Sequence, residues 1–440
     1  MNYSQALGYL DSFLNLEKLS QFPQNSFFNL RRMEHLLRIA GFPDKKFIPV
    51  LIAGTTGKGS TGFFLESILR ENRIPVGYYH SPHVEDIRER VRLDGAKAPK
   101  ILWARGLTRI KALLAKHPLP AKLGRLTYFE IMTFLAILVF SETGREIGIF
   151  EIGLGGRLDA TNVLNAPLVI LTPIHFDHTH FLGNTIAKIA REKAGIIKKG
   201  SFVVTVRQTS EAARVIKKVV RDNDARLIRA GIFRNRRRGL PGDFQDINAG
   251  AAVRAAEILR SEFDFRIDPR SYSGALSGKN WPGRLECFSK WRRTFVLDGA
   301  HNPVSIGRLV KTFRPASHLP GQGSDGRSRF RRSRKWLVFG AMQDKDSGTM
   351  LRVLSCVFDK IILTGVQCGR AKAIRLLAEE AKDLFKVTIP AQNVGEAFCL
   401  VEEISDPGDL VLVTGSFYLV GEARKILKFR TRNISKQGTK

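Results

Sequence analysis

The chain has 440 residues, of which 43% are hydrophobic and 25% charged, a composition typical of globular proteins with two or three domains. It contains no run of about 18 apolar residues, and its N-terminal stretch is amphipathic without a cleavage site, so we expect neither a membrane span nor a signal peptide. The net charge of +30 leaves two kinds of partner open, nucleic acid and small polyanionic substrates. Four cysteines, far apart and without metal or redox spacing, indicate a reduced, cytoplasmic protein.

Residues 1–46 have the pattern of two helices, and they lead into FIPVLIAGTTGKGS at 47–60, the stretch around which the chain is organised. Its apolar run predicts a buried strand, glycines then surround Lys58, and the apolar spacing of 61–70 predicts a helix. Backbone N–H groups at such a turn and helix start bind anions, and a lysine there reaches the outer phosphates of a nucleotide. The spacing differs from the usual G-x-x-x-x-G-K-[ST] loop, and the alternative is a tight turn with a surface lysine. We predict a site for nucleotide phosphates.

Strands and helices alternate further along the chain. The expected strands are 75–79, 147–152 and 168–174, and the expected helices are 101–116, 129–140, 186–197, 211–221 and 249–260, with a polar loop at 80–95. Each strand leads into a loop that carries a sequence motif. In an open parallel α/β sheet, ligands bind at the carboxyl ends of the strands, where these loops begin.

A linker at 277–286, punctuated by Pro282 and Gly283, precedes a second alternation. Its expected strands are 294–297, 336–339, 361–364 and 410–413, and its expected helices are 304–313, 371–381 and 394–404. The sequence therefore predicts an α/β protein of two domains. Residues 1–284 would form a phosphate-loop ATPase domain with a mainly parallel sheet, and residues 285–440 a smaller, Rossmann-like doubly wound domain.

The basic residues gather in two clusters, RNRRR at 234–238 and RSRFRRSRK at 327–335. We interpret both as solvated loops, with contact to nucleic acid as the alternative. The second cluster ends a low-complexity insertion at 315–334 that we expect to be disordered or mobile.

Acidic and histidine side chains follow two of the expected strands. Glu151 precedes the glycine-rich loop GLGGRLDATN, and Asp177, His178 and His180 follow the next strand. Oxygen and nitrogen ligands of this kind suit Mg²⁺, which bridges nucleotide phosphates in phosphoryl transfer. Taken singly, each feature has a plainer interpretation, as a turn between elements, a paired surface acid or a loop histidine.

A series of motifs from Ala53 to Arg424 occurs in the order of a known family. They are AGTTGKGS, SPHVEDIRERV, TYFEIMT, EIGLGGRLDATN, PIHFDHTHFLGNT, IAREKAGIIKKG, WPGRLE, LDGAHNP, FGAMQDKD and TGSFYLVGEAR. In these motifs the chain resembles the Mur ligase superfamily and, within it, folylpolyglutamate synthase/dihydrofolate synthase.

The resemblance implies an ATP-dependent ligase that adds L-glutamate to dihydropteroate and to the γ-carboxylate of reduced folates. ATP would phosphorylate the substrate carboxylate, and the amine of glutamate would attack the acyl phosphate to give an amide, ADP and phosphate. The implied cofactor is Mg²⁺, and whether the enzyme also uses a monovalent cation is left open. The expected partners are these small molecules, with no nucleic acid and no membrane, and the expected state is a monomer.

The resemblance also implies roles for individual residues, with closure of the two domains completing the nucleotide site. The residues expected to bind ATP are Thr55, Thr56, Gly57, Lys58, Gly59, Ser60, Asn248, Arg284, Asp298 and His301. Those expected on the pterin side are Thr127, Tyr128, Phe129, Glu130, Leu158, Asp159 and Ala160. The expected metal ligands are Ser81, Glu151 and His178, and the expected catalytic residues are Lys58, His178 and Lys193. Lys193 lies in the E-K-A-G-I motif, where related ligases carry a lysine carbamate; the alternative is an ordinary lysine at a helix end.

Several alternatives stay open. Thr56 stands where the family usually has asparagine, and TYFE favours a bifunctional enzyme over a strict folylpolyglutamate synthase. Another Mur-type ligase, such as one acting on a peptidoglycan precursor, would need a further N-terminal UDP-binding domain, and residues 1–46 are all that precede the phosphate-loop stretch. A nucleic-acid-binding protein that uses ATP is the alternative from a different class, suggested by the net charge of +30.

Overall fold

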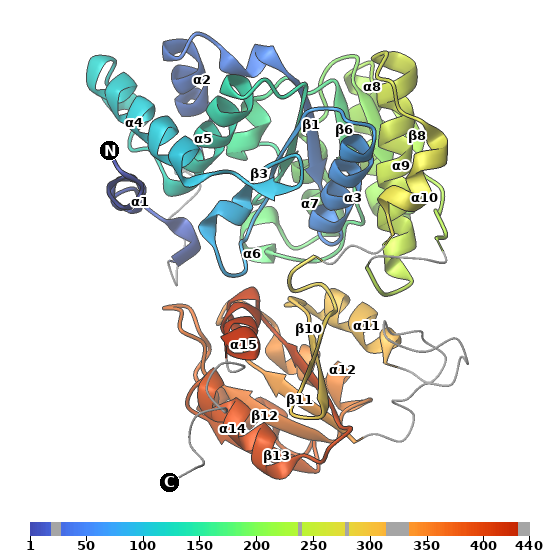
Figure 1. Cartoon of the computed structure of the whole chain (residues 1–440). Helices are drawn as coiled ribbons and strands as arrows, with labels where there is room; N and C mark the ends of the chain where they lie inside the picture. The colour runs from blue at the N-terminus through green and yellow to red at the C-terminus, as the bar shows by residue number, and fades with distance from the viewer. Residues whose placement is uncertain (19–27, 236–239, 278–280, 314–333, 430–440) are drawn as a thin grey trace. The chain divides into compact units, whose positions relative to one another are not determined.

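The computed structural model describes residues 1–18, 28–235, 240–277, 281–313 and 334–429 (Figure 1). The chain divides into two compact units. The first unit comprises Met1–His83, Ile87–Arg238 and Gln245–Ser277, and the second comprises Val84–Asp86, Gly239–Phe244 and Gly278–Lys440. Within the described ranges, no helix is long and apolar enough to cross a membrane. Three predicted segments lie partly outside the described residues: residues 315–333 of the insertion, residues 236–238 and 327–333 of the basic clusters, and residues 278–280 of the linker.

The first unit is built on an eight-stranded sheet of order β4-β3-β2-β5-β1-β6-β7-β8. Its strands are β1 (Ile48–Ala53), β2 (Val76–Tyr79), β3 (Val91–Leu93), β4 (Ala96–Lys97), β5 (Ile147–Glu151), β6 (Leu168–Leu171), β7 (Phe202–Thr205) and β8 (Arg226–Arg229). The pairs β2–β3 and β3–β4 are antiparallel, whereas β2, β5, β1 and β6 run parallel side by side. The carboxyl ends of these four strands, and the loops that follow them, therefore meet at one edge of the sheet.

Helices cover both faces of this sheet (Figure 1). The helices of this unit are α1 (Tyr3–Asp11), α2 (Leu30–Ile39), α3 (Lys58–Glu71), α4 (Lys100–Lys116), α5 (Tyr128–Glu142), α6 (Thr179–Leu182), α7 (Ile186–Ala194), α8 (Ser210–Asp222), α9 (Phe244–Glu262) and α10 (Tyr272–Ala275). Two neighbours in β2 point to opposite faces, as the pleat requires. Tyr78 packs against Gly62 of α3, and Tyr79 bonds to Thr133 of α5.

The second unit is built on a six-stranded sheet of order β13-β12-β11-β14-β10-β9, in which only β9 is antiparallel. Its strands are β9 (Glu286–Lys290), β10 (Arg293–Leu297), β11 (Lys335–Phe339), β12 (Lys360–Thr364), β13 (Val387–Ala391) and β14 (Leu410–Thr414). Its helices are α11 (Pro303–Thr312), α12 (Ser347–Ser355), α13 (Ile374–Ala381), α14 (Val394–Ile404) and α15 (Phe417–Phe429). Leu337 joins one core cluster with residues of α11, α12 and α13, and the adjacent Val338 joins another with residues of α14 and α15.

The predicted two-domain α/β class is confirmed, and the predicted strands and helices are present with shifted ends. The polar loop predicted at 80–95 is wrong in part, because it contains a 3₁₀ turn at Ile87–Arg90 and the strand β3. Two of its charged residues are held within the first unit: Arg90 is 2% exposed and paired with Glu17, and Arg92 is paired with the buried Glu66. Strands β4, β7, β8, β9 and β13 were not predicted; β4, β7 and β8 have only two to four residues, and β13 contains a proline.

Candidate active site

The phosphate loop joins β1 to α3 and is braced from behind by the loop that follows β6. The amide of Thr55 donates to the carbonyl of Pro173 at 2.9 Å, and its hydroxyl bonds to the backbone of His175 at 3.0 Å. The amide of Thr56 also points to Pro173, at 3.4 Å. Thr55, which we predicted to bind ATP, therefore holds the loop in place through both its amide and its side chain.

The remaining predicted residues of the loop begin helix α3. The first helical hydrogen bond runs from the amide of Thr61 to the carbonyl of Gly57, at 2.9 Å. The amides of Lys58, Gly59 and Ser60 precede that bond and have no partner within the helix, which makes them donors for an anion.

Asn248, from α9, lies directly against this loop. Gly57 has a φ of +90°, and a Cβ at this position would lie 2.3 Å from Asn248 Oδ1. Asn248 is 2% exposed, and its amide nitrogen donates to Gln245 Oε1 at 2.8 Å. The structure thus brings together two of the predicted nucleotide residues that are far apart in sequence.

Lys58, the first residue of α3, lies close to Glu151, the last residue of the neighbouring strand β5. Lys58 Nζ donates to the carbonyl of Gly54 at 3.2 Å and lies 4.0 Å from Glu151 Oε1. Glu151 is 5% exposed, and the hydroxyl of Tyr78 lies 3.5 Å from its other carboxylate oxygen. The same hydroxyl is 3.1 Å from the carbonyl of Gly59, so Tyr78 connects the carboxylate to the loop.

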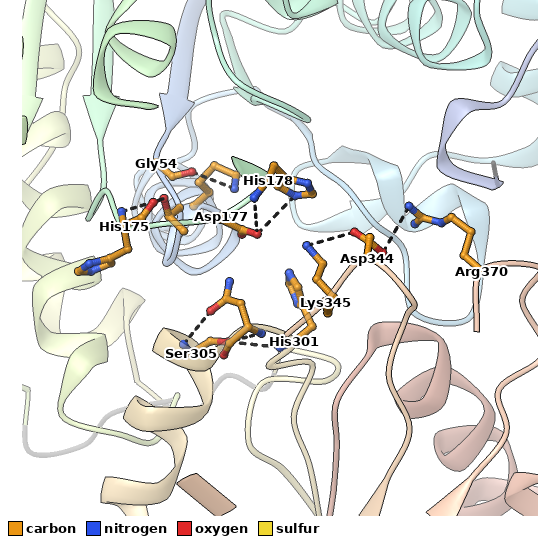
Figure 2. A network of polar contacts seen from close by, with 12 residues as sticks. Gly54, His175, Asp177, His178, His301, Ser305, Asp344, Lys345 and Arg370 are labelled. Atoms are coloured by element: carbon orange, nitrogen blue, oxygen red, sulfur yellow. Dashed lines mark hydrogen bonds and ion pairs between the residues drawn. The ribbon is translucent and has the colours of Figure 1, made fainter. Parts of the chain in front are cut away.

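The other predicted metal ligands lie on loops at the same edge of the sheet. Ser81 follows β2, and His178 follows β6 with its Nε2 3.8 Å from Asp177 Oδ1 (Figure 2). The side chain of His180 lies outside the described part of the chain. Among the described residues, no group of three His, Cys, Asp or Glu side chains is arranged to hold a metal ion. A hydroxyl, a carboxylate and an imidazole still suit Mg²⁺, because this ion usually takes one or two carboxylates and completes its shell with water and substrate phosphates.

Lys193, in α7, is a buried amine among these charges, with an exposed fraction of 5%. Burial, reinforced by the charge of Lys58, lowers the pKa of Lys193 to about 7, while Asp177 and Asp159 act in the opposite direction. Within the described residues, no carboxylate oxygen comes within 4 Å of its Nζ. The structure therefore gives Lys193 an amine whose charged and neutral forms are about equally populated at pH 7, close enough to Lys58 to feel its charge.

Asp159, predicted on the pterin side, closes the glycine-rich loop after β5. Its Oδ2 accepts hydrogen bonds from the amides of Gly153 (3.0 Å) and Leu154 (2.9 Å). Its Oδ1 accepts from the amide (3.0 Å) and the hydroxyl (2.6 Å) of Thr161. Burial raises the pKa of the Asp159 carboxyl, against these four donors, which lower it. Asp159 thus shapes the loop on which Leu158 is half-buried and Ala160 is buried.

The TYFE motif begins α5 and packs against that same loop. The hydroxyl of Thr127 accepts from the amide of Glu130 at 3.2 Å, and Glu130 Oε2 accepts from the amide of Thr127 at 2.7 Å, forming a capping box. The other oxygen of Glu130 accepts from Arg32 Nε at 2.7 Å. Burial raises the pKa of the Glu130 carboxyl, and Arg32 offsets part of this shift. Both oxygens of this carboxylate are therefore occupied within the protein.

Two aromatic residues of the motif are better placed to contact an apolar ligand. The Phe129 ring is half-buried and packs against Gly153, and it lies 5.9 Å from the ring of Tyr79. Tyr128 is 4% exposed, and the guanidinium of Arg90 lies 5.9 Å from the centre of its ring. These rings and Leu158 form the apolar part of the predicted pterin side.

In the second unit, Asp298 ties together the loops that carry two other predicted nucleotide residues. Its carboxylate accepts from the amides of Leu285 and Ala300, each at 2.9 Å. Burial raises the pKa of the Asp298 carboxyl, and the charge of Arg284 lowers it in part. Because Leu285 follows Arg284 and Ala300 precedes His301, Asp298 fixes the backbone beside both side chains.

His301 is oriented by its own loop. Its Nδ1 lies 2.8 Å from the carbonyl of Gly299, which can only accept, so Nδ1 carries the proton and Nε2 has the lone pair in the neutral ring. The amides of His301 and Asn302 both donate to Ser305 Oγ at 3.2 Å (Figure 2). Asn302 in turn caps α11, which anchors the loop.

A group of charges that we did not predict follows β11 and β12. Asp344 lies between Lys345 Nζ, at 3.6 Å, and Arg370 Nη1, at 3.9 Å (Figure 2). In the part of the chain that the structure describes, Arg370 Nε is buried with no hydrogen-bond partner. The FGAMQDKD motif was the only sequence signal for this cluster, and Arg370 had none. Two cations around one carboxylate leave a net positive charge.

Comparisons with known proteins extend over nearly the whole chain. The family model described as Mur ligase, glutamate ligase domain matches residues 283–417. Dihydrofolate synthase/folylpolyglutamate synthase of Bacillus subtilis (strain 168) is 32% identical over 426 residues, covering 91% of this chain and 95% of the relative. Folylpolyglutamate synthase of Lacticaseibacillus casei is 27% identical over 452 residues, covering 97% and 99%.

Solved structures of the same kind of enzyme are also similar to this chain over nearly its full length. Mycobacterium tuberculosis folylpolyglutamate synthase complexed with ADP matches with a TM-score of 0.84 at 27% identity, covering 97% of this chain and 98% of that chain. E. coli FolC in complex with DHPP and ADP matches with a TM-score of 0.78 at 26% identity, covering 98% of both chains.

Proposed function

The chain belongs to the dihydrofolate synthase/folylpolyglutamate synthase family and is an ATP-dependent glutamate ligase, and we propose that it adds L-glutamate both to dihydropteroate and to the γ-carboxylate of reduced folates. The observation that carries the proposal is the buried pair Glu151 and Lys193 beside the half-buried Lys58, at a phosphate loop whose first three helical amides have no partner within α3. The proposed domains are residues 1–284, which bear the phosphate loop, and residues 285–440.

The reaction has to convert a carboxylate into an electrophile, since its own leaving group would be oxide. The substrate carboxylate attacks the γ-phosphorus of ATP and releases ADP, which leaves an acyl phosphate. The amine of glutamate then attacks the acyl carbon, loses a proton and expels phosphate. The protein contributes position and charge neutralisation. In this proposal the amides of Lys58, Gly59 and Ser60 and the Lys58 ammonium bind the phosphates, and Asn248 fixes the loop.

The proposed metal site uses Ser81, Glu151 and His178. Mg²⁺ bound there would neutralise charge on the phosphoryl oxygens. Tyr78 and Lys58 keep the Glu151 carboxylate in place through its two oxygens. The Glu151 carboxylate is thus oriented at the edge of the sheet where the phosphate loop lies, and carboxylate oxygens are ligands that Mg²⁺ prefers, which supports a metal-binding role.

Lys193 is the proposed site of a carbamate. An amine reacts with CO₂ only when unprotonated, and burial gives Lys193 a pKa of about 7. Carbamylation replaces a cation that repels Lys58 with an anion that attracts it and can orient the ligands of a metal. The pterin would lie against Tyr128, Phe129 and Leu158, on a loop shaped by Asp159.

In the second unit we propose that Arg284 and His301 contact the nucleotide and that Asp298 holds their loops. We propose further that Lys345 and Arg370 receive the carboxylates of the incoming glutamate, because they are the cations around Asp344 at the carboxyl ends of β11 and β12. An amino acid with two carboxylates requires more than one cation.

The decisive experiment is ATP-dependent ligation of glutamate followed by mass spectrometry, with dihydropteroate and tetrahydrofolate offered in separate reactions. The proposal predicts a mass gain of one glutamate on each substrate, with release of ADP. Gain on tetrahydrofolate alone would show a strict folylpolyglutamate synthase. No gain on either would contradict the proposed substrates.

A further inference from the structure

Phe417, the first residue of α15, contacts two of the proposed nucleotide residues at once. The guanidinium carbon of Arg284 lies 4.7 Å from the centre of its ring. The imidazole of His301 lies 5.8 Å away, centre to centre, at an interplanar angle of 54°. Since the side chain is only 8% exposed, a single buried ring supports both groups.

The loop beside His301 is shaped to admit this ring. A Cβ on Gly299 would lie 2.4 Å from Cε1 of Phe417, too close for any other residue without a shift of the ring. The amide of Gly299 donates to the carbonyl of Gly283 at 2.8 Å, and its carbonyl accepts from His301. The WPGR turn, the DGAH loop and the ring are therefore packed as one group.

The contact with Phe417 holds Arg284 without using its N–H groups. Other arginines of this unit use theirs for structure: Arg424 donates to Glu286 and pairs with Glu85 at 2.6 Å, and Arg293 donates to Ser405 and to backbone carbonyls. Arg284 Nε, by contrast, is buried and meets no hydrogen-bond acceptor among the described residues. An aromatic face attracts a guanidinium while leaving its planar fork of donors available. A buried donor without a partner is unfavourable, so an anion is expected to complete it.

We propose that Phe417 is a positioning residue for the nucleotide, and that its ring holds the Arg284 guanidinium and the His301 imidazole in the orientation that binds the phosphates of ATP. This inference rests on the proposed function, because it takes Arg284 to be a nucleotide contact. A purely structural ring would affect stability without acting through Arg284. The two roles differ in their kinetic consequences.

The test compares the KM for ATP and kcat of the purified full chain with those of three variants. Phe417→Leu removes the ring and keeps an apolar side chain, so we expect the KM for ATP to rise about tenfold. Phe417→Tyr keeps the ring and should stay near wild type. Gly299→Ala leaves Phe417 in the sequence but displaces its ring, and it should raise the KM for ATP in the same direction.

A double mutant shows whether the ring acts through Arg284. In Arg284→Ala/Phe417→Leu the KM for ATP should rise by clearly less than the product of the two single effects, because residues that act as a unit are not additive and only the contact with His301 remains to be lost. Phe398→Leu is the matched control: this ring is fully buried in the same unit, against Phe295 and Trp291. It should lower the melting temperature and leave the KM for ATP unchanged.

Multiplicative effects in the double mutant, or an equal rise in Phe398→Leu, would overturn the inference. A raised KM in Arg284→Ala with an unchanged KM in both Phe417→Leu and Gly299→Ala would overturn it and leave the proposed function standing. An unchanged KM in Arg284→Ala would remove Arg284 from the nucleotide site and the inference with it. If Phe417→Leu does not fold, Gly299→Ala and the double mutant Arg284→Ala/Gly299→Ala decide the question.

Discussion

In each unit a buried aspartate accepts hydrogen bonds from the backbone of a proposed ligand-binding loop. The two units differ in the basic side chain that lies near this aspartate. In the first unit Asp159 accepts three backbone amides and one hydroxyl, and in the second Asp298 accepts two amides. The group near Asp159 is Lys193, a buried amine, whereas the group near Asp298 is Arg284, stacked on Phe417. The basic side chain of the first unit is therefore held by burial, and that of the second unit by contact with an aromatic ring.

This difference predicts how each site responds to change. A buried charge interacts strongly with its neighbours because little solvent screens it, so its removal should lower activity steeply. A stacked guanidinium depends on many weak contacts, and its loss should be more graded. The predictions below begin with the buried charges of the first unit.

The largest effect is expected for Glu151→Gln. The amide has the same shape but lacks the charge that a metal ion and Lys58 need, so ligation should fall about a hundredfold or more. The measurement is kcat for glutamate ligation, together with the melting temperature to confirm folding. Glu66→Gln is the control, because Glu66 is also buried in this unit but pairs with Arg92. Turnover close to wild type in a folded Glu151→Gln enzyme would contradict the metal role.

Lys193→Ala should come next, with activity reduced about a hundredfold if a carbamate orients the metal ligands. The distinctive sign is recovery of part of this activity when short carboxylic acids are added, since they can occupy the place of the missing carbamate. Wild-type enzyme depleted of CO₂ should in turn gain activity with bicarbonate. An active Lys193→Ala enzyme that ignores both additions would leave Lys193 as an ordinary lysine at the helix end.

The parts of this site that could be predicted from sequence are those that depend on local spacing. The phosphate loop follows from glycines around Lys58 after an apolar strand, and the family motifs led to Asn248, Arg284 and His301. The supports could not be predicted, because they join residues far apart in the chain. Arg90 and Glu17 are separated by 73 positions, and no local pattern marks a pair of that kind.

The loop-supporting roles of Asp159 and Asp298 could not be predicted either, for a different physical reason. Asp159 and Asp298 were predicted as ligand contacts, but their oxygens accept backbone amides, which every sequence has. Glu130 likewise closes a capping box and pairs with Arg32. Their roles in ligand binding stay predictions, and the structure adds that each supports its own loop.

A smaller effect is expected for Gly57→Ala in the phosphate loop. The new Cβ would meet Asn248 Oδ1 at 2.3 Å and would force a side chain into a φ of +90°. We expect the KM for ATP to rise about tenfold, within the range of strain that such a backbone imposes. Gly41→Ala is the matched control, because Gly41 has a φ of +77° and open space around it. Equal effects on the KM for ATP in both variants would show that backbone strain alone, away from Asn248, is responsible.

The smallest effect is expected in the pH dependence of stability, which compares the buried Lys193 of the first unit with Arg284 of the second. The pKa of Lys193 is about 7 in the folded protein, below its ordinary value of 10.5. Between these values the unfolded chain binds more protons than the folded chain, so the free energy of unfolding rises with pH. From pH 7 to pH 8 the gain should be about 1 kcal/mol in buffer depleted of CO₂, and Lys193→Met should lack it. An arginine keeps its charge throughout this range, so Arg284→Met should keep the wild-type slope. Urea unfolding at each pH measures the difference, and parallel curves for wild type and Lys193→Met would mean that the Lys193 amine is protonated in the folded protein.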